Sequence, residues 1–368
     1  MRAKRKKFLS GALVLAFAMS VSAAPTITEY AIPTANSSPQ GVTAGPDGNL
    51  WFTEGNANKI GRMTLGGVIT EFPIPTSNSS PRAITAGPDG NLWFTEYIGD
   101  RIGRITTAGV ITEFPIPAAN SNPQGIVTGP DGNVWFTEFT APFMPFGQMR
   151  TVGKITPTGT LTEYSYGPTP GPCAAPTDIT AGPDSKLWFG TTCAGFYRMT
   201  PAGAVELAFF VNGGFDNTVY GITTGPDANL WGTLYSAFQP LSRIVKLAPD
   251  GSVTLYILSQ PSAWPYGIAP GVDGNLWFTE VNGNAIAKIT PSGAITEYTI
   301  PTANSMPHGI ATGPDGNLWF VESAGNKIGK LEIITPPTVV PALSWSGMLI
   351  ILAVLLSCGL VQLHRRRR

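Results

Sequence analysis

The chain of 368 residues carries 23 Lys and Arg against 23 Asp and Glu, and it combines 43 Gly and 34 Pro with 43% hydrophobic residues. This composition excludes a disordered chain and indicates a packed β protein with many turns. Nine of the cations lie within residues 2–7 and 365–368, so the central body has an excess of negative charge. A nucleic-acid partner is therefore disfavoured, because phosphate binding needs clustered cations.

The first 24 residues have the pattern of a secretory signal peptide. A basic start is followed by an apolar run over residues 8–21 and by small residues at 22–24. Cleavage is expected after Ala23 or Ala24. The sequence therefore predicts an exported protein with residues 1–24 as its signal.

Seven tryptophans mark seven copies of one repeat. Their spacing is between 42 and 53 residues, at Trp51, Trp93, Trp135, Trp188, Trp231, Trp277 and Trp319. A period of this size with four short strands per copy is typical of propeller blades. The sequence predicts an all-β, seven-bladed β-propeller over residues 25–335.

Each copy reads as four strands. A first strand after a proline leads into Gly-Pro-Asp-Gly-Asn, whose Asp-Gly supplies the positive φ angles of a tight hairpin. The second strand, residues 49–54 in the first copy, is apolar on both faces, as a sheet between two neighbours requires. The third and fourth strands are expected at residues 59–63 and 69–72.

The last copy lacks its fourth strand. It ends at Ile333 without an Ile-Thr-Glu-Tyr segment, whereas the mature chain begins with that segment at Thr26. We expect residues 26–32 to complete the last blade and to close the ring.

Three cysteines are present, and Cys358 lies in the C-terminal apolar segment. Cys173 and Cys193 remain as the pair in the exported body, where a disulfide is plausible. The alternative is two unpaired thiols in variable loops.

Residues 336–368 form a tail with an apolar stretch over 348–363, followed by His364 and four arginines. Sixteen residues are few for a span, but with Trp345 and the arginines at the interfaces they predict a C-terminal transmembrane helix. The order of motif, apolar segment and Arg tail resembles bacterial sorting signals of the PEP-CTERM and IPTL-CTERM type. That resemblance implies a sorting enzyme as partner and display at the membrane or cell surface, with a plain tail anchor as the alternative.

Two positions per copy are expected to meet at one face of the propeller. The middle residue of Pro-x-Gly, or of its equivalent, is Gln40, Arg82, Gln124, Thr177, Tyr220, Tyr266 and His308. The third residue after each tryptophan is Glu54, Glu96, Glu138, Thr191, Leu234, Glu280 and Glu322. The pattern predicts a polar rim with five carboxylates, which would bind a cation or would serve only to hydrogen-bond loop amides.

His308 is the only histidine of the predicted propeller, and Glu322 lies fourteen residues further on. The two are candidates for an acid/base pair. The alternative is that His308 has no functional role. Tyr266, Arg82 and Glu280 are the candidate ligand-binding residues of the same rim.

The repeat Pro-x-Gly-Ile-x-x-Gly-Pro-Asp-Gly-Asn-Leu-Trp-Phe-Thr-Glu, followed by Asn-x-Ile-Gly-Arg-Ile and Ile-Thr-Glu-Phe, resembles the virginiamycin B lyase (streptogramin lyase) family over residues 26–334. The resemblance implies a seven-bladed propeller whose enzymes open a cyclic depsipeptide antibiotic by Mg²⁺-assisted elimination at the ester. It assigns His308 as the base and Glu322 as a carboxylate near the metal.

Two positions depart from that family pattern. A substrate-contacting histidine is replaced by Tyr266, and a metal carboxylate is replaced by Met306. Elimination needs base and metal positioned together. We therefore favour a monomeric, surface-anchored propeller that binds a small-molecule, peptide or glycan ligand on one face. An active Mg²⁺-dependent lyase and a purely structural repeat stay open as alternatives.

Overall fold

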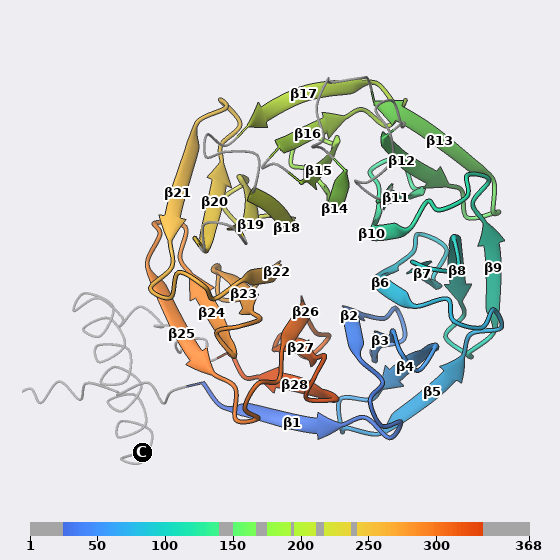
Figure 1. The fold of residues 1–368 in the computed structure, drawn as a ribbon, viewed down its shortest axis with the longest axis horizontal. Coiled ribbons are helices and arrows are strands. Elements are labelled where there is room, and N and C mark those ends of the chain that lie inside the picture. The colour runs from blue at the N-terminus through green and yellow to red at the C-terminus, as the bar shows by residue number, and fades with distance from the viewer. Residues whose placement is uncertain are drawn as a thin grey trace, which may run out of the picture. The chain divides into compact units, whose positions relative to one another are not determined.

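The computed structural model describes residues 25–139, 150–166, 175–192, 195–210, 217–236 and 241–333. These residues form seven antiparallel sheets of four strands, arranged around a central axis (Figure 1). The predicted seven-bladed propeller is confirmed.

Six blades follow one another along the chain, each built from its innermost strand outward. The first two contain β2 (Pro39–Ala44), β3 (Leu50–Glu54), β4 (Lys59–Met63), β5 (Ile69–Pro73), β6 (Pro81–Ala86), β7 (Leu92–Glu96), β8 (Arg101–Ile105) and β9 (Ile111–Pro115). The third and fourth contain β10 (Pro123–Thr128), β11 (Val134–Glu138), β12 (Arg150–Ile155), β13 (Leu161–Tyr166), β14 (Pro176–Ala181), β15 (Leu187–Thr191), β16 (Gly195–Met199) and β17 (Val205–Phe210). The fifth and sixth contain β18 (Asn217–Thr224), β19 (Leu230–Ser236), β20 (Arg243–Leu247), β21 (Val253–Ile257), β22 (Pro265–Pro270), β23 (Leu276–Glu280), β24 (Ala285–Ile289) and β25 (Ile295–Thr299).

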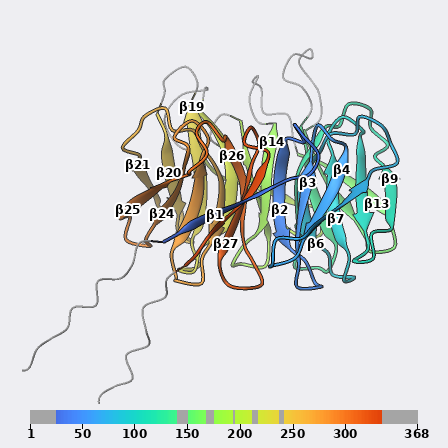
Figure 2. The same ribbon diagram turned by 90° about the horizontal axis from the view of Figure 1, so that it is seen from below.

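The seventh blade joins the two ends of the propeller. It contains β26 (Pro307–Thr312), β27 (Leu318–Glu322) and β28 (Lys327–Leu331), and its outer strand is β1 (Ile27–Ala31) from the start of the chain. β1 pairs antiparallel with β28 and crosses the outside of the blade (Figure 2). Glu29 reinforces the pairing by accepting hydrogen bonds from Lys327 Nζ at 3.0 Å and from the Thr302 amide at 2.9 Å. The predicted closure by residues 26–32 is confirmed.

The second strand of each blade is buried on both faces, as expected. Each repeat tryptophan also donates from Nε1 to the aspartate four residues before it, as Trp51 does to Asp47 at 3.0 Å. The same aspartate caps a turn in which Gly48 has φ of 74°, a value that favours glycine. The hydrogen bond therefore ties the hairpin turn to the core of its blade.

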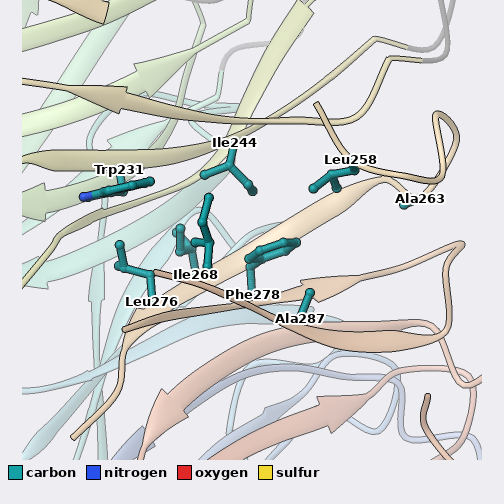
Figure 3. Packing of buried hydrophobic residues seen from close by; sticks show 9 residues of the cluster. Trp231, Ile244, Leu258, Ala263, Ile268, Leu276, Phe278 and Ala287 are labelled. Carbon is teal, nitrogen blue, oxygen red and sulfur yellow. The ribbon is translucent and has the colours of Figure 1, made fainter. Parts of the chain in front are cut away.

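Apolar side chains fill the space between neighbouring blades. Figure 3 shows the contact between the fifth and sixth blades, where Trp231 and Ile244 face Leu276 and Phe278. Corresponding clusters lie between the other neighbours. Because each sheet packs on two others, the ring holds the ends of the seven inner strands at fixed positions around the axis.

Several predicted features lie outside the described residues. They are the signal peptide over residues 1–24, Cys173 and Cys193, and the tail over residues 336–368. Among the residues that are described, we find no helix long and apolar enough to cross a membrane.

Candidate functional site

The inner strands enclose a cavity of about 190 Å³ on the propeller axis. Six of the seven predicted Pro-x-Gly side chains line it, namely Gln40, Arg82, Gln124, Thr177, Tyr220 and Tyr266. We call this space the channel cavity. Its lining shows that the Pro-x-Gly positions of six blades converge on the axis, as the repeat predicts.

His308 borders the channel cavity through two of its lining residues. Its ring stacks on that of Tyr266 with centroids 4.7 Å apart and planes at 25°. Its Nδ1 lies 2.9 Å from Oε1 of Gln40 in the next blade. The imidazole is thus fixed by one contact on its face and another on its edge.

The environment of Gln40 determines which nitrogen of His308 carries the proton. The Gln40 amide nitrogen donates to the Ser38 carbonyl at 3.3 Å and to the hydroxyls of Ser38 and Ser323 at 3.0 and 3.1 Å. A carbonyl oxygen only accepts, so the amide nitrogen must face it and Oε1 must face His308. Oε1 cannot donate, so Nδ1 bears the hydrogen and Nε2 keeps its lone pair.

His308 is neutral at pH 7. Burial, and after it the positive charge of Arg82, lowers the pKa of His308 to about 4. The ring therefore offers an unprotonated Nε2 over the whole neutral range. Such a group accepts a hydrogen bond or a proton.

Arg82 is the cationic residue that lines the channel cavity. Its guanidinium carbon lies 3.7 Å from the ring centroid of Tyr97, a close cation–π contact. Within the described part of the chain the guanidinium has neither an ion pair nor a side-chain hydrogen bond. Its donors are available to a ligand.

Asp178 is a cavity residue that sequence reasoning missed. It occupies the last position of Pro-x-Gly, where the other six blades carry Gly or Ala. Its Oδ2 accepts the amide of Ile222 at 3.1 Å, and burial raises its pKa to about 6. This departure from the repeat could have identified Asp178 from the sequence, because a carboxylate side chain replaces the glycine or alanine of the other inner strands.

A row of aromatic rings borders one side of the site and was also missed. Tyr235 contacts Trp264 at 5.6 Å, Trp264 contacts Tyr220 at 5.8 Å, and Tyr220 contacts Tyr266 at 5.3 Å between centroids. With His308 on Tyr266, these five rings form a continuous aromatic arc across the fifth, sixth and seventh blades. The repeat predicts neither the positions of Tyr235 and Trp264 nor the contacts that join the five rings into an arc.

The five carboxylates expected at a polar rim do not line the channel cavity. Glu54, Glu96, Glu138, Glu280 and Glu322 are at most 1% exposed and do not line the cavity. Each lies inside its own blade near the glutamate of an outer strand, as Glu280 does near Glu297. Burial, followed by that neighbouring carboxylate, raises the pKa of Glu280 to about 8.

His308 and Glu322 do not form the expected acid/base pair in this geometry. Pro307 faces Glu322 across the two strands, but a bulge between Pro307 and Ile310 puts an extra residue into β26. His308 consequently bonds to Gln40, while the carboxyl of Glu322 lies against Ser305 and Gly325. The separate roles assigned to the two residues stay predictions.

A family model described as the virginiamycin B lyase family matches residues 19–195 and 142–336. The chain belongs to the virginiamycin B lyase family.

Solved structures agree with this membership. A streptogramin B lyase is 33% identical with a TM-score of 0.75, and the match covers 84% of this chain and 98% of that chain. A catalytically inactive histidine-to-alanine variant of virginiamycin B lyase from Staphylococcus aureus with quinupristin is 32% identical with a TM-score of 0.75, covering 84% and 100%. Kuenenia stuttgartiensis hydrazine synthase, at 13% identity and a TM-score of 0.65, covers 83% and 98% and shares the fold alone.

The Mg²⁺ ion that resemblance to virginiamycin B lyases implies requires hard oxygen ligands. Position 306 presents a methionine thioether, which is a soft ligand, and Met306 is 38% exposed. Both carboxyl oxygens of Glu322 are buried within the blade. The residues present do not fit a Mg²⁺ site of this kind.

Proposed function

We propose that this member of the virginiamycin B lyase family captures a small-molecule, peptide or glycan ligand at the channel cavity and leaves its bonds intact. The stacked pair of His308 and Tyr266, beside an Arg82 that forms no ion pair with any described residue, is the observation that carries the proposal. Binding sites characteristically combine such apolar faces with a few placed polar groups.

The polar groups around the cavity differ in what they offer. Arg82 donates, Asp178 accepts, and Gln124 does both. Tyr220 and Tyr266 add flat apolar surface that loses little conformational entropy on binding. This set orients a ligand through one cation, one carboxylate and one amide, and it offers no pair of carboxylates that would hold a metal ion.

The second candidate is an active lyase that opens a cyclic depsipeptide lactone. The lone pair on Nε2 of His308 favours it, because elimination begins with removal of a proton from carbon. The ester carboxylate must leave as that proton is taken, and its negative charge needs stabilisation. Met306 occupies the position of the family's metal carboxylate, and its thioether is a poor ligand for a Mg²⁺ ion that would stabilise this charge. The active lyase is therefore the weaker candidate.

The location of the protein is part of the proposal. We infer export directed by residues 1–24, and retention at the membrane or cell surface by residues 336–368, with a sorting enzyme as one route. Cell fractionation tests this. The full chain should sediment with membranes, and a chain ending at residue 335 should appear in the medium. Release of both chains alike would contradict anchoring.

A binding panel tests the capture function. The full chain, labelled with ¹⁵N at histidine, is titrated with quinupristin, with N-acetylphenylalanine and with a neutral oligosaccharide, and the ring signals of His308 are followed by NMR. We expect a saturable shift from at least one compound. A Tyr266→Leu variant should lose most of the affinity, whereas Lys288→Gln, which changes a cation stacked on Trp277 outside the cavity, should keep it. No saturable shift from any compound would contradict the proposal.

A further inference from the structure

We infer that the ligand of the channel cavity bears a carboxylate next to an aromatic ring, as the C-terminal aromatic residue of a peptide does. This inference rests on the proposed capture function and narrows its ligand class. Three features of the cavity carry it: the guanidinium of Arg82, the carboxylate of Asp178 and the aromatic arc.

The first feature predicts an anionic partner. Arg82 lies in the cavity wall, half-buried, with its face on Tyr97 and its N–H groups without an ion pair in the described residues. A partly desolvated guanidinium that forms no ion pair with a described residue favours binding of an anion, and its planar fork matches a carboxylate with two parallel hydrogen bonds.

The second feature limits the charge of that anion to one. Asp178 shares the cavity with Arg82, and His308 beside it is neutral at pH 7. A dianion such as a phosphate monoester would meet one cation and one repelling carboxylate. A monoanionic carboxylate needs only the single guanidinium that the cavity offers.

The third feature predicts a ring. Tyr220 and Tyr266 line the cavity, and their rings contact Trp264 on one side and His308 on the other. Aromatic rings prefer tilted or offset neighbours at the separations found in this arc, and its rings already hold each other in place. A ligand ring therefore adds to an ordered stack at small entropic cost.

The size of the cavity agrees with this class. A volume of about 190 Å³ accommodates one aromatic side chain with its terminal carboxylate, but not a folded domain or a long oligosaccharide. A longer peptide would place only its last residue inside. The rest of that peptide would remain above the inner strands.

Calorimetry on the full chain tests the inference with four small probes. N-acetylphenylalanine is compared with N-acetylphenylalaninamide, which lacks the charge, with N-acetylalanine, which lacks the ring, and with glucuronate, which pairs the charge with a sugar. We expect N-acetylphenylalanine to bind about tenfold or more tightly than each of the others, in line with the usual strength of a hydrogen bond to a charged group.

Variants assign the preference to residues. Arg82→Gln should abolish the discrimination between acid and amide, and Arg82→Lys should restore part of it. Arg62→Gln is the matched control, since Arg62 stacks on Trp51 and Phe72 and is not a cavity residue. Thermal melts establish that each variant is folded, and Arg82→Lys preserves the test if Arg82→Gln is not.

The outcomes distinguish a failure of this inference from a failure of the proposed capture function. Equal binding of acid and amide, or tighter binding of glucuronate, would overturn the aromatic carboxylate class and leave ligand capture standing. Discrimination that survives in Arg82→Gln would also overturn it. If none of these probes, quinupristin or the neutral oligosaccharide binds, both the inference and the capture function are wrong.

Discussion

His308 of the seventh blade donates from Nδ1 to Oε1 of Gln40 in the first blade, at 2.9 Å. β1 completes the last sheet at the outer edge of the same seventh blade. The hydrogen bond therefore links the inner strands of the last and first blades and fixes the ring of the one histidine in the described residues.

Gln40 is predicted to hold His308 in the Nδ1–H tautomer. In Gln40→Leu the ring should become a mixture of tautomers, and in Gln40→Glu the new carboxylate should raise the pKa of His308 above its present value of about 4. Histidine ¹⁵N NMR across a pH titration reports both. Gln124→Leu, at the same position two blades away, is the control. An unchanged tautomer in Gln40→Leu would refute the assignment.

The buried glutamates predict that stability falls as pH rises from about 5 to 9. Burial, and next the neighbouring outer-strand glutamate, raises the pKa of Glu54 and Glu96 to about 8, against about 4.3 in an unfolded chain. Between these values the folded state binds more protons than the unfolded state, so stability drops with pH and levels off above about 8. Thermal melts at constant ionic strength measure the slope.

One variant isolates this effect. Glu96→Gln keeps the shape of the protonated side chain and cannot ionise. It should therefore reduce the fall of stability with pH and stabilise the protein at pH 9. The expected gain is about 1.4 kcal/mol for each unit by which the folded protein raises the pKa of Glu96. Glu332→Gln, on an exposed glutamate, should leave the slope unchanged. A melting temperature that stays constant or increases from pH 5 to 9 would contradict the raised pKa values of the buried glutamates.

Removal of β1 should open the ring. A chain that begins at residue 33 loses the pairing with β28 and the tilted contact between the rings of Tyr30 and Trp319, whose centroids are 5.7 Å apart. We expect the free energy of unfolding to fall by at least about 2 to 5 kcal/mol, the usual cost of losing one buried isoleucine side chain, because Ile32 is buried and is removed with β1. Urea unfolding measures it, with a chain that begins at residue 25 as control. Equal stability of the two chains would show that β1 does not close the ring.

Ligand capture should not depend on Mg²⁺. The thioether of Met306 and the enclosed carboxyl of Glu322 leave the ion without the pair of carboxylates that it prefers. Adding Mg²⁺ or a chelator should change neither the His308 ring signals nor the affinity for the probe that binds, and Glu322→Gln should behave like the natural protein. A saturable response to Mg²⁺ that Glu322→Gln abolishes would establish a metal site.

The fold was predictable because its signals are local and repeated. Seven tryptophans at blade spacing gave the number of sheets, and the displaced Ile-Thr-Glu-Tyr segment at Thr26 gave the closure. The convergence of Gln40, Arg82 and Tyr266 followed from the same repeat.

The site was only partly predictable. The repeat predicted that His308 and Glu322 meet at one face of the propeller, but the bulge after Pro307 shifts the register by one residue and separates them. Trp264 and Asp178 depart from the repeat, so their contribution depends on contacts between blades that no single copy encodes.

Incubation with quinupristin in the presence of Mg²⁺ tests most directly whether this propeller binds without opening an ester. Elimination leaves the elemental composition unchanged, so the ring-opened isomer is identified by chromatographic retention and by its fragmentation pattern. We predict that quinupristin is recovered intact after prolonged incubation with the natural protein. Accumulation of the linear isomer with the natural protein, and its absence with His308→Ala, would contradict the account.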